Sequence, residues 1–251
     1  MFSSRTSYLA RLALRNFRHS LPLTKTMPFT ELALPKLKAG PEVKAAFAAQ
    51  RPTSAKILAS QPTIIRAFFG SVIRENEIST EEENKPIIVI EWTEEAAFNF
   101  FLTSEDFAAF IGPIKPLADG PAEIQVFDTD VGLLGVVSAP LTEIIRIQLK
   151  DDAESAVVTK DAWTVLVKAQ GSAVPVTSGT SLNLKDGVFM GTIGWKSLEV
   201  RASTLEASPA RTALSKLRDV GEFSSILIKV EPFKTASKWE GMPRSKLIVH
   251  L

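Results

Sequence analysis

The residue types that most often carry chemistry near neutral pH are almost absent from the body of this 251-residue sequence. There is no cysteine, the two histidines are His19 and His250, and the only tyrosine is Tyr8. Cysteine-based metal sites and thiolate nucleophiles are therefore excluded, and an imidazole base is available only near the two ends. We expect no cofactor and no metal, and any general base in the body must be a carboxylate.

Glu31, Glu91 and Glu143 are the carboxylates that we consider for such a role, because each lies within or at the edge of an apolar segment. Burial in an apolar environment would raise the pKa of a carboxyl group toward the range that a general base needs. Glu31 and Glu143 stand near the starts of two predicted strands, however, and solvated positions at the rim explain them equally well. We assign a catalytic role to none of the three.

Arg146 and Gln148 stand out because they interrupt the apolar character of the segment 144–149. Successive side chains of a strand point to opposite faces, so Arg146 and Gln148 share a face with Ile144, and the fully apolar face begins at Ile145. The apolar face should pack against helices, which turns Arg146 and Gln148 toward the other side of the sheet. There a guanidinium and an amide could orient a polar or enolate-bearing ligand. Alternatively, Arg146 pairs with a carboxylate of another strand or reaches the rim.

Three aromatic residues complete the candidate ligand-binding set. Trp92 and Trp195 each end an apolar strand-like run, and Phe68 precedes Phe69 in a strand that is apolar on both faces, so one of the two phenylalanines must point inward. They could shape a pocket for a flat hydrophobic compound. The alternative for both tryptophans is packing in the core, because the indole ring is large and apolar wherever it lies.

Two stretches of the sequence resemble each other, which indicates an internal repeat. Residues 30–38 and 142–150 both begin with Thr-Glu and end with Leu-Lys, at an offset of 112. The strands that end at Trp92 and Trp195 match at an offset of 103. The difference is absorbed by residues 75–86, an acidic stretch that reads as a long hairpin loop of the first copy only.

Each copy has the order strand, helix, strand, strand, helix, strand. In the first copy the predicted elements are a strand at 30–38, a helix from Pro41 to Pro62, strands at 63–74 and 86–92, a helix within 104–117 and a strand at 123–127. In the second copy they are a strand at 142–150, a helix at 153–170, a hairpin of 174–184 and 188–195 that turns at Asp186-Gly187, a helix that includes 211–218, and a strand at 225–231.

This order is that of the ferredoxin-like, split βαβ motif, whose sheet carries helices on one face and leaves the other bare. Two such units can bury their bare faces against each other. We therefore predict an α+β fold in which two tandem ferredoxin-like units form one intramolecular α/β barrel. On these features the chain resembles the dimeric α/β barrel superfamily, especially its antibiotic-biosynthesis-monooxygenase-like and stress-responsive members.

The predicted domain organisation follows from the repeat. It consists of a leader (1–27), a first unit (28–130), a linker (131–139), a second unit (140–233) and a C-terminal tail (234–251). The leader has five basic residues and no acidic one, and its arginines alternate with apolar residues, as is typical of a mitochondrial transit peptide. The alternatives are a basic terminus without a targeting role, and a cytoplasmic form that starts at Met27.

The composition limits the partners that we expect. Formal net charge is +1, and the residues after the leader carry 24 basic against 28 acidic side chains, so nucleic acid is not an expected partner. No apolar stretch is long enough to predict a membrane span. A barrel closed within one chain predicts a monomer.

Two functions remain open at the level of the sequence. The resemblance implies a barrel that binds a small hydrophobic or aromatic molecule, in the manner of a cofactor-independent monooxygenase, isomerase or cyclase. The alternative is a non-catalytic, stress-responsive or protein-interaction barrel whose interior is filled by its own side chains. A well-formed pocket with converging polar groups would favour the first, and an occluded interior would favour the second.

Overall fold

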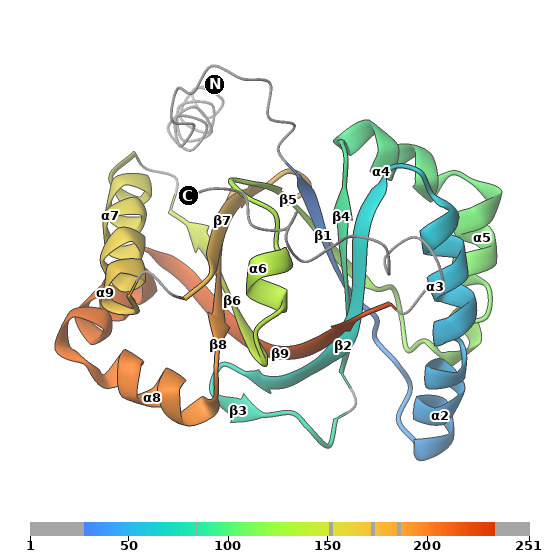
Figure 1. The fold of residues 1–251 in the computed structure, drawn as a ribbon, viewed down its shortest axis with the longest axis horizontal. Coiled ribbons are helices and arrows are strands. Elements are labelled where there is room, and N and C mark those ends of the chain that lie inside the picture. The colour runs from blue at the N-terminus through green and yellow to red at the C-terminus, as the bar shows by residue number, and fades with distance from the viewer. Residues whose placement is uncertain (1–27, 84, 151–152, 172–173, 185–186, 234–251) are drawn as a thin grey trace, which may run out of the picture.

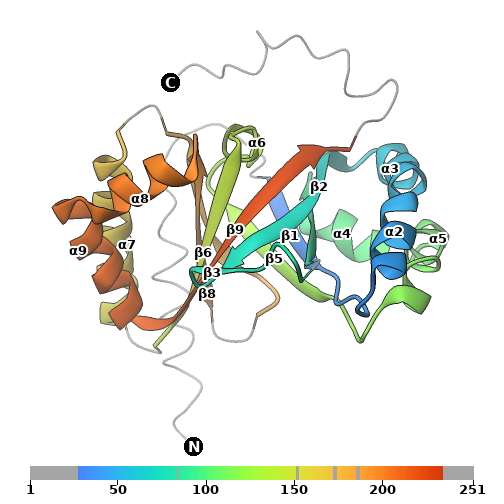
Figure 2. The same ribbon diagram turned by 90° about the horizontal axis from the view of Figure 1, so that it is seen from below.

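The computed structural model describes residues 28–83, 85–150, 153–171, 174–184 and 187–233. The predicted leader, the predicted tail and Asp186 of the predicted hairpin turn lie outside these residues. The chain forms a central barrel of strands with a layer of helices on each of two opposite sides (Figures 1 and 2).

The first half of the chain supplies four barrel strands and the helices on one side. Its strands are β1 (Phe29–Leu34), β2 (Ile64–Glu75), β4 (Pro86–Trp92) and β5 (Glu123–Thr129), with the two-residue β3 (Ile78–Ser79) paired to the end of β2. Its helices are α2 (Pro41–Ala49), α3 (Arg51–Ser60), α4 (Glu95–Leu102), α5 (Glu105–Ile111) and the 3-10 turn η1 (Lys115–Leu117).

The second half has the same order of elements. Its strands are β6 (Leu141–Leu149), β7 (Val176–Ser181), β8 (Val188–Trp195) and β9 (Gly221–Pro232), and its helices are α7 (Ala153–Ala169), α8 (Leu198–Glu206) and α9 (Ser208–Asp219). The short helix α6 (Leu134–Val137) lies in the predicted linker between the halves.

Strand pairing confirms the predicted fold class. The sheet order is β2-β4-β1-β5 in the first half and β7-β8-β6-β9 in the second, so each half is arranged as its second, third, first and fourth barrel strands. All pairings are antiparallel. Two seams join the halves, β5 to β7 over three residue pairs and β2 to β9 over seven, and they close the eight strands into a barrel.

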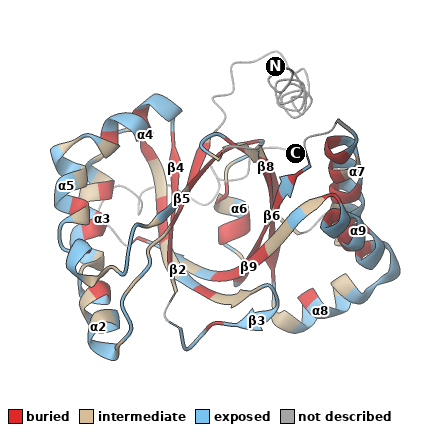
Figure 3. Cartoon of the chain, turned by 180° about the vertical axis from the view of Figure 1, so that it is seen from behind, coloured by how far each residue is buried: buried red, intermediate tan, exposed pale blue. Residues whose placement is uncertain are grey.

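The apolar core has three parts because both faces of the sheet are buried, as the burial colours of Figure 3 show for the strands. One part lies between the first half of the sheet and helices α2 to α5, and a second lies between the other half and helices α7 to α9. The third fills the inside of the barrel. Every residue of β4 and β8 is buried, which explains why these strands read as continuous apolar runs.

The predicted helix from Pro41 to Pro62 is two helices, which meet at Gln50. Pro52 explains the break, because a proline inside a helix has no N–H to donate and its ring collides with the carbonyl four residues earlier. Pro52 is accommodated by starting a new helix at Arg51, where the first N–H groups need no helical partner. The corresponding segment of the second half has no proline and forms the single 17-residue helix α7.

The acidic insertion of the first half binds the second half. β2 continues to Glu75, and Asn76 and Glu77 turn the chain with positive φ values of 47° and 69°. The Asn76 side chain accepts a hydrogen bond of 3.0 Å from the Ser225 backbone N–H. Glu77 receives two hydrogen bonds from the Arg201 guanidinium, at 2.6 and 2.9 Å. The turn therefore joins the end of β2 to β9 and α8 of the second half, next to the longer seam.

Substitution of Gly70 by alanine tests how closely this seam is packed. A Cβ atom at Gly70 would lie 2.0 Å from the backbone oxygen of Lys229 and 2.7 Å from the Cα of Val230, and backbone atoms of a paired strand cannot move aside without breaking the pairing. We expect Gly70→Ala to lower the free energy of unfolding by about 1–3 kcal/mol, measured by urea denaturation. Gly135→Ala is the control, because its Cβ would meet only Pro175 at 3.5 Å. Equal stabilities of the two variants would contradict the close packing of this seam.

Candidate functional site

A cavity of about 450 Å³ opens at the end of the barrel opposite α6. Its walls come from the first residues of β5, β8 and β9 and the last residues of β6, so most of it belongs to the second half. The lining residues are Glu123, Gln125, Arg146, Gln148, Leu184, Val188, Glu222, Phe223 and Ser224. We call it the mouth cavity. Its volume is within the usual range for pockets that bind small molecules.

The structure brings Arg146 and Gln148 to this cavity together. Ile145, Ile147 and Leu149 pack against the helices of the second half, and the alternation of β6 then turns Arg146 and Gln148 inward. The predicted orientation of this strand is confirmed. The second interpretation of Arg146 also holds in part, because its Nη1 lies 3.4 Å from the Glu123 Oε1 across the barrel.

Arg146 is held in a poorly compensated environment. Its side chain is 12% exposed, and among the described residues its Nε has no hydrogen-bond partner. Burial lowers the pKa of the guanidinium, and the nearby charges of Glu123 and Glu75 offset only part of this effect. A buried donor without a partner is unfavourable by about 1–3 kcal/mol, so the fold holds this guanidinium at a cost in stability.

Gln125 is a cavity residue that the sequence did not indicate. It is 4% exposed, and its Nε2 donates a short hydrogen bond to the Glu123 Oε1, the atom that Arg146 also faces. Within the described part of the chain its Oε1 accepts no hydrogen bond. The alternation of β5 could have revealed it, because Ile124 and Val126 pack toward the helices and leave Gln125 on the inner face.

The barrel interior beyond the cavity is filled by side chains. Phe68, Phe127, Ile144 and Met190 belong to a cluster that occupies the middle of the barrel. Phe68 is therefore turned inward and Phe69 outward, but Phe68 does not line the mouth cavity. Phe68 belongs to the interior cluster and not to the cavity wall.

The far end of the barrel is closed by α6. Leu133 and Val137 join the interior cluster, and the Leu133 N–H donates a short hydrogen bond to the Glu91 carboxylate. Glu91 is fully buried and forms an ion pair of 3.0 Å with Arg66. Because Glu91 lies at this closed end and is paired with Arg66, it cannot serve the mouth cavity as a base.

Trp92 and Trp195 lie on the outer side of the barrel wall and line no part of the cavity. Both are fully buried beneath helices, in the cores of the first and second half respectively. Each indole N–H donates a hydrogen bond of 2.9 Å, Trp92 to Glu31 and Trp195 to Glu143. The structure therefore places the two tryptophans according to the alternative interpretation, packing in the core.

The expectation of solvated rim positions for Glu31 and Glu143 is wrong. They are only 6% and 3% exposed, because each lies on the helix-covered face of the sheet, beside the tryptophan of the neighbouring strand. Glu143 also receives two hydrogen bonds from Arg201, at 2.7 and 3.0 Å, and these bonds and those of Glu77 outweigh the effect of burial and raise the Arg201 pKa. The residue equivalent to Arg201 in the first half is Phe98.

Within the described residues, Glu31 therefore forms no ion pair with a cationic side chain. Burial raises its pKa from 4.5 to about 7, and the hydrogen bond from Trp92 opposes this only in part. Its position outside the barrel separates this perturbed carboxyl group from the mouth cavity. Among the three candidate bases, none reaches the cavity, and the carboxylates that do line it are Glu123 and Glu222.

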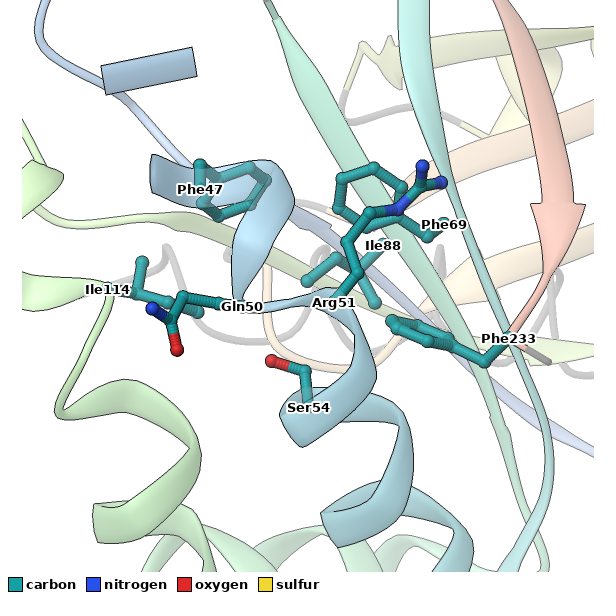
Figure 4. A pocket seen from close by; sticks show the side chains of 8 residues that line it. All are labelled: Phe47, Gln50, Arg51, Ser54, Phe69, Ile88, Ile114 and Phe233. Carbon is teal, nitrogen blue, oxygen red and sulfur yellow. The ribbon is translucent and has the colours of Figure 1, made fainter. Parts of the chain in front are cut away.

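A second hollow, outside the barrel, is too small for a ligand. It lies between α2, α3 and the sheet and has a volume of about 10 Å³, enough for about one water molecule. Figure 4 shows the Arg51 side chain over the Phe69 ring, 3.8 Å from its centroid, with Phe233 beside them. These contacts fill the space and fasten the end of β9.

The described residues hold no group of three or more potential metal ligands of the His, Cys, Asp or Glu type. No helix among them is long and apolar enough to cross a membrane.

Comparison with known proteins supports the fold. No protein-family model matches the sequence, and no curated protein is recognisably similar to it in sequence. Three solved structures share its architecture at 13–14% identity. A candidate monooxygenase from Fusobacterium nucleatum matches over 85% of this chain and 100% of its own, with a TM-score of 0.58. An anthrone oxidase-like protein covers 85% and 95% at 0.59, and a mutant chlorite dismutase from Candidatus Nitrospira defluvii covers 84% and 94% at 0.55. These likenesses show a monooxygenase-like α+β barrel fold.

Replacement of Glu31 by glutamine tests its unusual environment. The folded protein holds a proton at Glu31 that the unfolded chain releases above pH 4.5, so the wild type loses stability as the pH rises from about 4.5 to about 7. Glutamine cannot ionise and keeps an acceptor for Trp92. We expect the difference in unfolding free energy to shift in favour of Glu31→Gln by about 1–3 kcal/mol between pH 4.5 and pH 8, measured by urea denaturation.

The equivalent substitution in the second half is the matched control. Glu143→Gln removes the negative charge that faces the buried Arg201, so we expect it to destabilise the protein at both pH values. If Glu31→Gln were as destabilising as Glu143→Gln at pH 8, Glu31 would have to be a stably charged group.

Proposed function

We propose that this protein binds a small hydrophobic or aromatic molecule in the mouth cavity and acts on it as a monooxygenase-like enzyme without a resident cofactor. The observation that carries the proposal is the open cavity of about 450 Å³, on whose walls Arg146, Gln125 and Gln148 lie together. A cavity of this size with a few converging polar side chains is typical of a binding site.

The walls of the cavity suit a partly apolar ligand. Leu184 and Val188 supply aliphatic surface, and the interior cluster forms a closed apolar layer beneath. The ligand would lie with its polar end at Arg146 and its ring against these side chains. The likeness to a candidate monooxygenase and to an anthrone oxidase-like protein supports an activity of this general kind on the same barrel fold.

The same groups could take part in the oxygenation of a substrate that is activated by loss of a proton. A substrate that loses a proton from carbon or oxygen develops negative charge on oxygen, and a fixed Arg donor stabilises such charge. Glu123 and Glu222 are the cavity carboxylates that could accept the proton. Molecular oxygen would be the oxidant and the substrate the electron donor: one oxygen atom would replace two hydrogens on the substrate carbon, and the other would leave with them as water. The likeness to an anthrone oxidase-like protein supports a substrate of this type.

A non-catalytic barrel is the second candidate, and one observation favours it. Side chains of the protein itself fill the centre of the barrel. The described residues that line the mouth cavity therefore do not extend to the far end, which α6 closes. A protein-interaction or stress-responsive role would need no ligand in the mouth cavity. The two candidates therefore differ in whether the purified protein retains or takes up a small molecule.

Native mass spectrometry of the purified full-length protein, followed by extraction and identification of what is bound, separates the two candidates. We expect a co-purifying aromatic compound, or uptake of an uncharged hydrophobic probe such as Nile red. An empty protein that takes up no probe would contradict the proposal and favour the non-catalytic barrel.

Replacement of Arg146 by leucine assigns the ligand to the cavity. We expect Arg146→Leu to reduce ligand retention at least tenfold while the melting temperature stays within a few degrees of the wild type. The fold should tolerate the change because Glu123, which forms the ion pair with Arg146, is 48% exposed and remains hydrated without it. Arg51→Leu, on the outer side of the barrel, is the control and should retain the ligand. Unchanged retention by Arg146→Leu would place the ligand elsewhere.

A further inference from the structure

We propose that Asn183 is a positioning residue of the mouth cavity: its side chain takes the place of strand pairing between the two halves and so holds Leu184 in the apolar wall of the cavity. This inference rests on the proposed function, because it names a residue that shapes the site of the same ligand. It is carried by the hydrogen bonds of Asn183 and by the place of Leu184 in the cavity wall.

The shorter seam between the halves ends before it reaches the mouth. Within the described residues, β7 pairs with β5 only at Phe127, Asp128 and Thr129. The first residues of β5, among them Glu123 and Gln125 of the cavity wall, therefore gain no strand partner from β7. The wall of the cavity at this point depends on contacts other than regular strand pairing.

Asn183 supplies these contacts. After β7 ends at Ser181, the Leu182 N–H donates a hydrogen bond of 2.8 Å to the Val126 carbonyl oxygen. The Asn183 Oδ1 accepts a hydrogen bond of 2.9 Å from the Val126 N–H, and the Asn183 Nδ2 donates one of 2.7 Å to the Ile124 carbonyl oxygen. The side-chain amide thus binds the backbone of β5 as the peptide groups of a paired strand would, and both its oxygen and its nitrogen are fixed.

Leu184 follows Asn183 directly and is part of the cavity. It lines the mouth and also packs against the cluster that fills the barrel interior. The other aliphatic residue of the wall, Val188, is held by β6 instead, because it pairs with Gln148. The two ends of the β7–β8 connection are thus attached to different strands of the barrel, and Leu184 belongs to the end that Asn183 attaches to β5.

The hydrogen bonds of Asn183 should matter more for the cavity wall than for the stability of the fold. Asn183 is exposed, so water can bind the backbone groups of β5 when its side chain is removed. The loss of its two hydrogen bonds would release the residue next to Leu184 from β5. Leu184 could then leave the position in which it bounds the cavity.

A double-mutant cycle on the affinity for Nile red, measured by fluorescence titration of the full-length protein, tests the inference. We expect Leu184→Ala to weaken binding about fivefold, because the shorter side chain loses apolar contact with the probe. We expect Asn183→Ala to weaken binding by a similar factor while the melting temperature stays within a few degrees of the wild type. Because both substitutions remove the same contact, the double variant should also be weakened about fivefold, whereas independent effects would multiply to about twenty-fivefold.

Asp130→Ala is the matched control, because Asp130 binds β7 at the opposite end of the same seam. Its Oδ1 accepts a hydrogen bond of 3.0 Å from the Ser178 N–H, and it is exposed, as Asn183 is. Asp130 does not line the mouth cavity, so this variant should bind Nile red as tightly as the wild type.

Three results would overturn the inference and leave the proposed binding function in place. They are wild-type affinity in Asn183→Ala or Leu184→Ala, an effect of Asp130→Ala as large as that of Asn183→Ala, and multiplied effects in the double variant. If the wild type bound no Nile red, the inference would fail, and the proposed function would fail with it if the purified protein also carried no ligand.

Discussion

Closure of the sheet is the constraint on which the rest of this structure depends. Each half forms a four-stranded sheet whose helices cover only one face, and strands such as β4 and β8 are apolar on both faces. Exposed apolar surface is unfavourable by about 25 cal/mol per Å², so the second face must be buried as well. The seams β5–β7 and β2–β9 accomplish this by turning the two uncovered faces toward each other. The interior cluster is the product of that closure, and it leaves free space only where polar side chains replace apolar ones, at the mouth.

The two halves share an architecture but differ in how they handle buried charge. At equivalent positions, Glu31 and Glu143 accept the same 2.9 Å hydrogen bond from a tryptophan. The second half adds Arg201, which also binds Glu77 of the first half and so links the two halves electrostatically. The first half places Phe98 against Trp92 instead, with ring centroids 5.9 Å apart. In the second half the glutamate thus belongs to a charged network, and in the first half the equivalent glutamate is a carboxyl group whose ionisation is disfavoured.

Much of the fold followed from the sequence, because strand alternation and the repeated order of elements are local signals. The orientations of Arg146 and Gln148 were predictable in the same way. What could not be predicted depends on pairing between distant segments. The burial of Glu31 and Glu143 arises from partners 61 and 52 residues away, and the role of Arg201 depends on a turn 124 residues away. The inward position of Gln125 depends on which face of β5 the helices cover, and that face is set by the pairing of β5 with β1 and β7. Trp92 and Trp195 could not be assigned to one face without the register of β4 and β8.

The position of the cavity within the barrel follows from the same asymmetry. At the α6 end, Glu91 binds Arg66 and the Leu133 N–H, so its charge is compensated and the helix can close the barrel. At the mouth, a single carboxylate oxygen, Glu123 Oε1, faces both Arg146 and Gln125, and one acceptor cannot satisfy two side chains that together offer more donors and a further acceptor. The two ends therefore differ in how they are filled. Helix α6 and the apolar side chains of Leu133 and Val137 close one end, whereas at the other end polar side chains stand in the inner positions and border an open cavity.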